Sequence, residues 1–273
     1  MHIEKVWALY YSATGTTELA ARTVAGEMAA RLGVPLEAIP FTLPAQREKT
    51  YTFCKTDLVV AATPVYAGKI PNKILPDFQT KLAGNGAVAV PIVLFGNRSY
   101  DNGLAELCAV LKNSGFLLAG AGAFVARHAF TDELGTGRPD ENDQAEMRAF
   151  ADKIADKAAA LQAAPAPLQV PGDPDAPYYV PKGMDGLPAK FLKAKPKTDP
   201  AACTACGLCA RVCPMGSIDS GDFSLVSGVC IKCQACVRGC PQKAKYFDDP
   251  AFLSHVEMLK THFRDAKKNE IFL

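Results

Sequence analysis

Apolar residues in the first part of the chain form short continuous runs that alternate with longer stretches of helical periodicity. Residues 5–11 are almost all apolar and show no alternation, which is the pattern of a parallel strand buried on both faces. From about residue 17, apolar side chains recur every four positions between Ala20 and Leu32, and Gly33 ends the pattern. These residues predict a strand followed by an amphipathic helix.

The alternation of strands and helices continues to residue 161. Segment 40–56 is irregular, so the helix after the second strand is expected to be short or missing. Strands that alternate with helices predict a parallel sheet covered by helices on both faces. We therefore expect an α/β domain over residues 1–161, built on a doubly wound five-stranded parallel sheet. Its other strands are expected at 34–39, 57–62, 86–95 and 116–125, and its other helices at about 73–82, 102–114 and 141–161.

The next part of the chain has a different composition. Residues 162–200 contain nine prolines and little periodicity, which predicts a semi-extended linker over residues 162–197. Its aromatic residues Tyr178 and Tyr179 are apolar enough to dock on a neighbouring surface. A small cysteine-rich domain is expected at 198–249, and residues 250–273 are expected to form a C-terminal helix or tail.

Eight of the ten cysteines fall in two runs that share the spacing C-x2-C-x2-C-x3-C-P and lie 27 residues apart. This is the spacing of bacterial ferredoxins with two [4Fe–4S] clusters, in which the fourth cysteine of each run ligates the other cluster. It predicts a small α+β, ferredoxin-like domain that folds around its inorganic centres. The expected ligands are Cys203, Cys206, Cys209 and Cys240 for one cluster, and Cys213, Cys230, Cys233 and Cys236 for the other.

Two other uses of cysteine are less consistent with this pattern. Zinc sites use two close cysteines, a longer gap and another close pair, whereas each run here has four cysteines and ends in Cys-Pro. A disulfide framework is typical of small secreted domains, which this chain does not resemble. The remaining two cysteines, Cys54 and Cys108, are expected to be buried thiols.

Composition and charge exclude some classes of partner. The chain has 273 residues, of which 49% are hydrophobic, so at least one domain can bury a substantial core. Its formal net charge of +2 gives no sign of nucleic-acid binding. No apolar run approaches the 18 residues of a membrane-spanning helix, and the first residues show no secretory pattern. We expect a cytoplasmic protein without membrane insertion.

The turn after the first predicted strand is rich in hydroxyl side chains. Residues 12–17 read Ser-Ala-Thr-Gly-Thr-Thr and lead directly into the helix. Hydroxyl and backbone N–H donors at a helix N-terminus suit a terminal phosphate. The turn has neither the Lys of a nucleoside-triphosphate loop nor the G-x-G-x-x-G of a dinucleotide site. An ordinary capped helix would also favour Ser and Thr here.

Two further polar loops, residues 63–71 and 95–102, follow the third and fourth predicted strands. In open α/β sheets, ligands bind beyond the carboxyl ends of the strands. With these three loops, residues 3–160 resemble the flavodoxin family, whose members bind FMN. The resemblance implies an FMN phosphate in the first loop, which matches the family's S-x-T-G-x-T motif, and the flavin ring between the other two.

Within the ring loops, Tyr66 and Tyr100 are candidates to stack on the flavin, although either could equally cover the core. The FMN-binding residues that the resemblance implies are Ser12, Thr14, Gly15, Thr16, Thr17, Thr63, Pro64, Val65, Tyr66, Ala67, Gly68, Gly96, Asn97, Arg98, Tyr100, Asp101 and Asn102.

The whole chain resembles flavodoxin–ferredoxin fusion proteins, which are regarded as anaerobic electron carriers. The resemblance implies a protein that moves electrons between FMN, two [4Fe–4S] clusters and redox partner proteins, without naming the donor or the acceptor. No catalytic residues are expected, so a carrier is favoured over an enzyme. Two alternatives stay open: a flavin oxidoreductase, linked to NAD(P)H or a substrate, with the clusters as an internal wire, and a module whose clusters are only structural.

Overall fold

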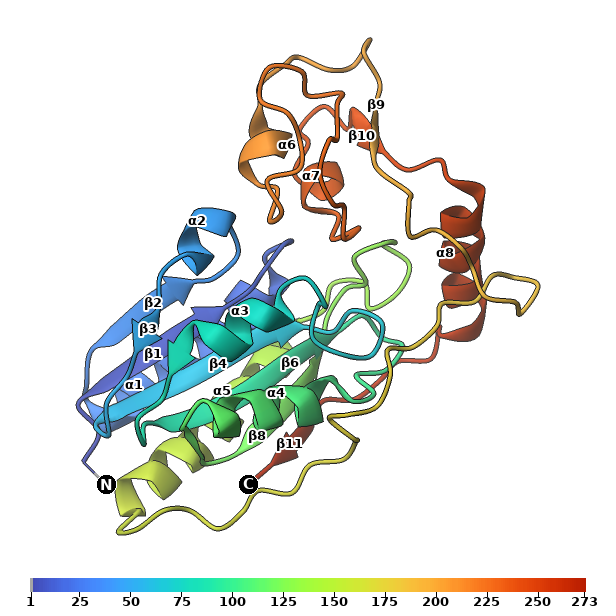
Figure 1. Ribbon diagram of the computed structural model, residues 1–273. Helices are drawn as coiled ribbons and strands as arrows, with labels where there is room; N and C mark the ends of the chain where they lie inside the picture. Colours follow the sequence, from blue (N-terminus) through green and yellow to red (C-terminus); the bar gives the residue numbers. More distant parts are fainter. Residues whose placement is uncertain (1) are drawn as a thin grey trace.

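A twisted sheet forms the centre of the computed structural model, which describes residues 2–273 (Figure 1). Five strands of the sheet run parallel in the order β2-β1-β4-β6-β8, with the short strand β7 paired to β6. Counted along the chain, this is the order 2-1-3-4-5 of flavodoxin-like sheets. The strands are β1 (Lys5–Tyr10), β2 (Leu36–Pro40), β4 (Asp57–Pro64), β6 (Val88–Phe95), β7 (Leu117–Leu118) and β8 (Ala121–Val125).

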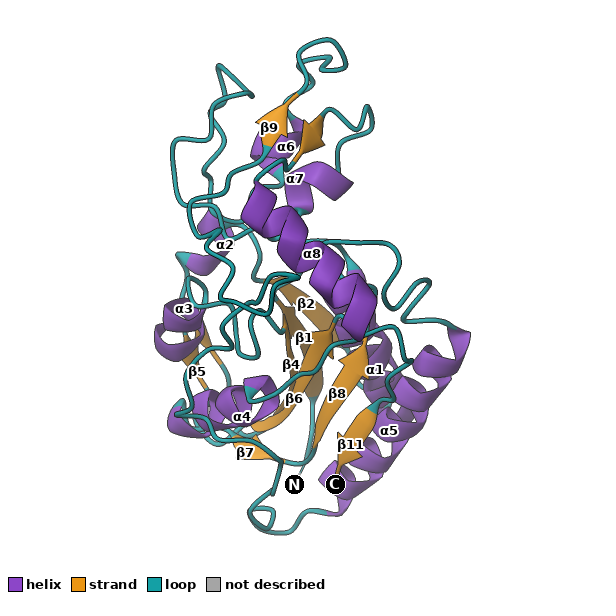
Figure 2. Ribbon diagram, turned by 90° about the vertical axis from the view of Figure 1, so that its right-hand side faces the viewer, coloured by secondary structure: helices purple, strands orange, loops and turns teal. Residues whose placement is uncertain are grey.

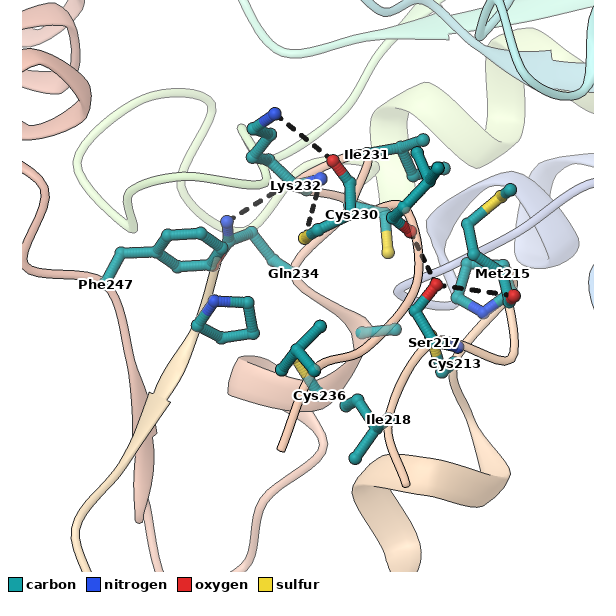
Figure 3. A pocket seen from close by; sticks show the side chains of 16 residues that line it. Cys213, Met215, Ser217, Ile218, Cys230, Ile231, Lys232, Gln234, Cys236 and Phe247 are labelled. Atoms are coloured by element: carbon teal, nitrogen blue, oxygen red, sulfur yellow. Dashed lines mark hydrogen bonds between the residues drawn. The ribbon is translucent and has the colours of Figure 1, made fainter. Parts of the chain in front are cut away.

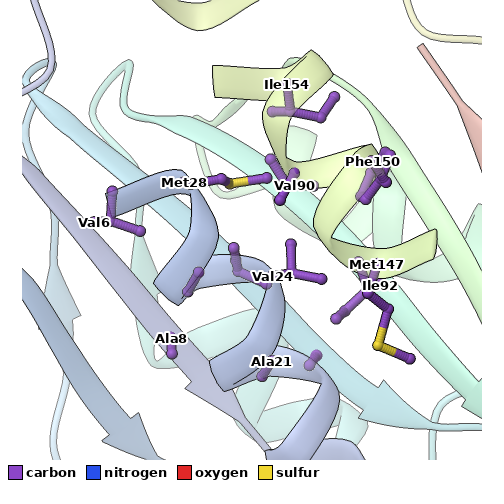
Figure 4. Packing of buried hydrophobic residues seen from close by; sticks show 14 of the residues in the cluster. Val6, Ala8, Ala21, Val24, Met28, Val90, Ile92, Met147, Phe150 and Ile154 are labelled. Atoms are coloured by element: carbon purple, nitrogen blue, oxygen red, sulfur yellow. The ribbon is translucent and has the colours of Figure 1, made fainter. Parts of the chain in front are cut away.

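Helices cover both faces of this sheet, as the sequence predicts (Figure 2). On one face, Val24 and Met28 of the first long helix pack with Phe150 and Ile154 of the last one against Val90 of β6 (Figure 4). The opposite face carries a second apolar cluster with Phe78 and Leu104. The four covering helices are α1 (Thr16–Leu32) and α5 (Glu141–Ala160) on the first face, and α3 (Leu75–Thr80) and α4 (Gly103–Asn113) on the second.

The irregular stretch after β2 contains only a one-turn helix, α2 (Pro44–Arg47), and two short strands that pair with each other, β3 (Tyr51–Thr52) and β5 (Leu82–Ala83). The expectation of a short or missing second helix is therefore correct. Cys54, however, is exposed, contrary to the expected buried thiol, because it lies in the turn before β4 and not within the strand. Cys108 is buried on α4, as expected.

Residues 161–196 contain no helix and no strand ladder, and they run along the α/β part as an extended segment (Figure 1). The cysteine-rich segment that follows is small and consists mostly of loops. It contains one antiparallel pair of two-residue strands and two one-turn helices. These elements are β9 (Lys197–Thr198), β10 (Lys245–Tyr246), α6 (Leu208–Arg211) and α7 (Ala235–Arg238).

The last part of the chain differs from the expected terminal helix. Helix α8 (Pro250–His262) is capped at its N-terminus by Asp249, whose carboxylate accepts the N–H of Phe252 at 2.8 Å. The residues after it are mostly polar, so a longer helix would have no apolar face to bury. Instead, β11 (Glu270–Phe272) pairs antiparallel with β8 and adds a further edge strand to the sheet. Pairing satisfies the backbone groups of an otherwise open edge.

None of the helices in residues 2–273 combines the length and the apolar character needed to cross a bilayer.

Candidate functional site

The cysteines of the two runs line two separate cavities, and each cavity combines cysteines from both runs. One is lined by Cys213, Cys230, Cys233 and Cys236, together with apolar side chains (Figure 3). The other is lined by Cys203, Cys206, Cys209 and Cys240. These are the two sets expected from the sequence. Within residues 2–273, no three His, Cys, Asp or Glu side chains surround a point that a single metal ion could fill.

The loops that carry the cysteines have matching backbones in the two halves. Ala205 and Lys232 stand just before the second cysteine of each run, and both have a positive φ, 53° and 55°. Gly207 and Gln234, just after that cysteine, are left-handed as well. Residues other than glycine seldom adopt this conformation, so the repeated geometry indicates a constraint common to both loops: the chain must curl tightly around the cavity.

Burial controls the protonation of the thiols in these cavities. Burial raises the pKa of Cys233 well above its ordinary value and that of Cys236 to about 12. Backbone N–H groups already point at three sulfur atoms, from Ser217 to Cys213 Sγ at 3.4 Å, from Lys232 to Cys230 Sγ at 3.4 Å and from Ala244 to Cys240 Sγ at 3.3 Å. Because iron binds thiolate, a metal centre must displace these protons.

A third and much larger cavity, of about 430 Å³, opens at the carboxyl ends of the sheet strands. The loops after β1, β4 and β6 all contribute to it, which the strand topology predicts for a ligand site. The expected FMN-binding residues that line this cavity are Thr14, Thr16, Thr17, Pro64, Val65, Tyr66, Ala67, Gly68, Gly96 and Arg98.

The other expected residues do not line the cavity, and several of them hold the surrounding chain in place. Asn97 Nδ2 donates to the carbonyl of Phe263 at 2.7 Å, which ties the third loop to the end of α8. Tyr100 packs on Phe95, and its hydroxyl donates to Glu270 of β11 at 2.7 Å. Tyr100 is therefore not positioned to stack on a ligand in the cavity, whereas Tyr66 lines it.

The other five members of the expected set shape their own loops. Gly15 gives α1 its left-handed N-cap at a φ of 92°. Ser12 Oγ accepts the N–H of Glu18 in the first turn of α1 at 3.1 Å. Thr63 is fully buried at the end of β4. Asp101 forms an ion pair with Arg98, and the backbone N–H of Asn102 donates to the carbonyl of Gly68. These residues do not line the cavity themselves but hold the loops that do.

The linker covers the second loop in a way that local sequence patterns do not reveal. Tyr179 donates its N–H to the carbonyl of Ala67 at 2.8 Å, and Arg98 lies 4.1 Å from the centre of the Tyr179 ring. Lys69 is buried between Glu106, at 3.0 Å, and the linker carbonyls of Pro174 and Ala176. The docking that the aromatic residues of the linker suggested is thus present, and Tyr178 and Tyr179 line the cavity.

His128, which sequence reasoning missed, also lines the cavity, in the loop after β8. Burial lowers its pKa to about 3, and its neighbours His255 and Arg238 add to the shift. Its Nδ1 accepts the N–H of Phe130 at 3.1 Å, so the neutral ring carries its proton on Nε2. No motif marks this histidine, because only the fold brings it beside Gly96.

The large cavity and one cysteine cavity share a wall. Cys230, Ile231 and Lys232 line both of them, as does Val229. Lys232 is buried, and its ammonium donates to the carbonyl of Leu192 at 2.5 Å and to that of Cys230 at 3.2 Å. A ligand in the large cavity would therefore lie against the loop that carries a cluster cysteine.

The family of 4Fe–4S binding domains matches residues 196–219, and a second match to 4Fe–4S binding domains covers residues 227–246. The cysteine-rich segment is a ferredoxin-type module. Zinc is thereby set aside, and the two matches in the ferredoxin-type module (residues 196–246) indicate two [4Fe–4S] centres.

Solved structures give likenesses over little more than half of the chain. An archaeal flavodoxin is 12% identical over 57% of this chain and 99% of its own, with a TM-score of 0.38. The flavodoxin of Streptococcus pneumonia TIGR4 is 18% identical over 57% of this chain and 98% of its own, at 0.40. An NADH:FMN oxidoreductase is 16% identical over 59% of this chain and 92% of its own, with a TM-score of 0.41. No curated protein matches the chain. The strand order of the sheet is that of the flavodoxin-like fold.

Arg238 fixes the ferredoxin-type module to the flavodoxin-like part. Its guanidinium donates to the carbonyls of Ala129, at 2.7 Å, and His128, at 2.8 Å, and pairs with Asp132 at 2.7 Å. Arg211, the equivalent residue in the first half of the module, bonds only to the nearby carbonyl of Cys206 at 3.0 Å. The two arginines occupy the same position in the two halves of the module, but only Arg238 bonds to the flavodoxin-like part.

Replacing Arg238 with Ala should loosen this contact and leave both cavities of the module in place. Since three bonds to the 128–132 loop are lost, we expect roughly tenfold faster amide hydrogen exchange there. The measurement is hydrogen–deuterium exchange on the full chain with its cofactors bound. Arg211→Ala is the control, and equal effects from the two substitutions would show that Arg238 does not hold the interface.

Proposed function

We propose that this chain is an electron-transfer protein in which FMN, bound in the large cavity, exchanges electrons with the two clusters of the ferredoxin-type module. The module already indicates a redox role. The observation that supports the rest is the shared wall, because Cys230 lines the large cavity and a cysteine cavity alike. Centres bound in the two cavities would lie on either side of the same loop, which favours direct electron exchange between them.

The size of the large cavity and the chemistry of its lining support FMN as its ligand. Thr14, Thr16 and Thr17 would receive the phosphate at the N-terminus of α1, where hydroxyl and N–H donors and the helix dipole favour an anion. Tyr66 and Gly96 would border the ring. When bound, FMN supplies a centre that accepts electrons in pairs and releases them singly, whereas each cluster carries one.

In the module, we propose that Cys203, Cys206, Cys209 and Cys240 hold one cluster and that Cys213, Cys230, Cys233 and Cys236 hold the other. The second set is the one whose cavity adjoins the proposed FMN site. The first set lies in the other cavity, where Cys206 is exposed. Electrons would therefore pass between FMN and the second cluster, and between the first cluster and a redox partner protein.

We propose that residues 1–161 are the FMN-binding unit, 162–197 the linker, 198–249 the cluster-binding unit and 250–273 a C-terminal tail. The linker and the tail would act as straps, since Tyr179 contacts Ala67 and Asn97 contacts Phe263. Straps of this kind keep the donor and the acceptor together, so that transfer does not depend on diffusion. Reduced thiols suit the cytoplasm as the place of action.

An anaerobic absorbance titration of the holoprotein separates this proposal from a flavin oxidoreductase. If the protein is a carrier, NADH and NADPH leave the flavin and cluster bands oxidised, and dithionite or a low-potential protein donor bleaches them. Rapid bleaching of the flavin by either nicotinamide, followed by the clusters, would contradict the carrier assignment and support a reductase.

A further inference from the structure

Tyr11 stands directly after β1, at the carboxyl edge of the sheet, and its side chain is fully buried. Its hydroxyl is the one buried side-chain oxygen or nitrogen without a hydrogen-bond partner among residues 2–273. A buried hydroxyl that bonds to nothing costs free energy. Such an atom in a native fold therefore indicates a partner that the polypeptide itself does not supply.

The surroundings of Tyr11 identify where that partner lies. The apolar cluster that contains Tyr11 is continued by Met215 and Ile231 of the ferredoxin-type module. Both residues line the cavity of Cys213, Cys230, Cys233 and Cys236, as Figure 3 shows. Arg47 fixes the same contact between the flavodoxin-like part and the module, because its guanidinium donates to the carbonyl of Pro214 at 2.7 Å.

Charge at this position supports the same placement. Burial raises the pKa of the Tyr11 hydroxyl well above its ordinary value, and the nearby Cys233 and, to a smaller extent, Cys213 contribute to the rise. Tyr66 is a polar neighbour of Tyr11 on the side of the large cavity, and the two side chains affect each other's pKa, but their hydroxyls do not meet the geometry of a hydrogen bond. The Tyr11 hydroxyl thus stays protonated and can donate.

We propose that the Tyr11 hydroxyl donates a hydrogen bond to a sulfur atom of the cluster held by Cys213, Cys230, Cys233 and Cys236, and so raises its reduction potential. Hydrogen bonds to cluster sulfur are one of the factors that set such potentials. The bond favours the reduced state because reduction adds negative charge to the acceptor. A residue of the flavodoxin-like sheet would thereby adjust a centre in the neighbouring module. This inference rests on the ligand sets proposed above.

The matched pair Tyr11→Phe and Tyr10→Phe tests this inference in the full-length holoprotein. Both substitutions remove only a hydroxyl, but that of Tyr10 bonds to Glu18 at 2.6 Å on the opposite face of the sheet. Redox titration followed by electron paramagnetic resonance should show two cluster potentials. In Tyr11→Phe we expect one of them to fall, so that the ratio of reduced to oxidised cluster at a fixed potential drops roughly fivefold.

The expected result includes a second readout, namely the loss of an exchangeable proton coupled to the reduced cluster in Tyr11→Phe, with Tyr10→Phe unchanged in both measurements. Unchanged potentials and an unchanged proton coupling in Tyr11→Phe would overturn the inference, as would an equal shift of both clusters. Iron, sulfide and FMN contents are measured on the same samples. If wild-type protein lacks a cofactor, the proposed function fails, whereas full cofactor content without a shift refutes the Tyr11 bond alone.

Discussion

Replacing Cys206 with Ser should remove about half of the iron and sulfide from the protein and leave the FMN content unchanged. Cys206 lines the cavity of the first proposed ligand set and contributes nothing to the large cavity. A serine hydroxyl is a poor substitute for a thiolate, because iron–sulfur clusters require soft sulfur ligands. The affected centre is the one farther from the shared wall, so the proposed flavin–cluster pair should survive.

Iron, acid-labile sulfide and flavin analyses on anaerobically reconstituted protein provide the measurement. Cys54→Ser is the matched control, because Cys54 is an exposed cysteine outside both cavities. We expect it to retain all three cofactors. Loss of both clusters together with FMN from Cys206→Ser would show that the cofactor sites do not form independently, and would contradict the separate cavities.

The double substitution Thr14→Val and Thr17→Val should weaken FMN binding by at least about 100-fold without bleaching the cluster absorbance. Valine has nearly the shape of threonine but lacks the hydroxyl. The change therefore removes two donors to a charged phosphate, each of which contributes about 1.5–3 kcal/mol. Thr17 is buried at the start of α1 and lines the cavity with Thr14. Water therefore cannot easily take the place of its hydroxyl.

Fluorescence titration of apoprotein with FMN measures the dissociation constant, and riboflavin serves as a ligand that lacks the phosphate. The double variant should bind FMN and riboflavin with similar affinity, whereas the native chain should prefer FMN. Thr80→Val, an exposed substitution on α3 away from the cavity, should retain the native preference. An unchanged FMN affinity in the double variant would place the phosphate elsewhere.

Local patterns in the sequence predicted the parts of this structure that depend on local physics. The continuous apolar runs of β4 and β6 are buried on both faces, which is why they could be recognised as parallel strands. The cysteine spacing predicted which cysteines line each of the two small cavities, since the reach of short loops is set by chain geometry. The position of the loops that line the large cavity follows from strand order, because the carboxyl ends of parallel strands meet at one edge.

The parts that sequence reasoning missed depend on tertiary contacts. Tyr100 and Asn97 lie in a predicted ring loop, yet they bond to Glu270 and Phe263, more than 150 positions away. Nothing in the polar run after α8 indicates that β11 completes the sheet, because a three-residue edge strand has no distinctive period. Similarly, Arg211 and Arg238 occupy the same position of a repeat, and only the fold shows that one of them binds the neighbouring domain.

We expect electrons to pass between FMN in the large cavity and the adjacent cluster within one chain. Flash photoreduction of anaerobic holoprotein, with flavin and cluster absorbance followed separately, tests it most directly. Because Cys230 lines both cavities, we predict that the rate constant for electron exchange between flavin and cluster is independent of protein concentration. A rate that rises in proportion to protein concentration, or a flavin that stays reduced beside oxidised clusters, would contradict the account.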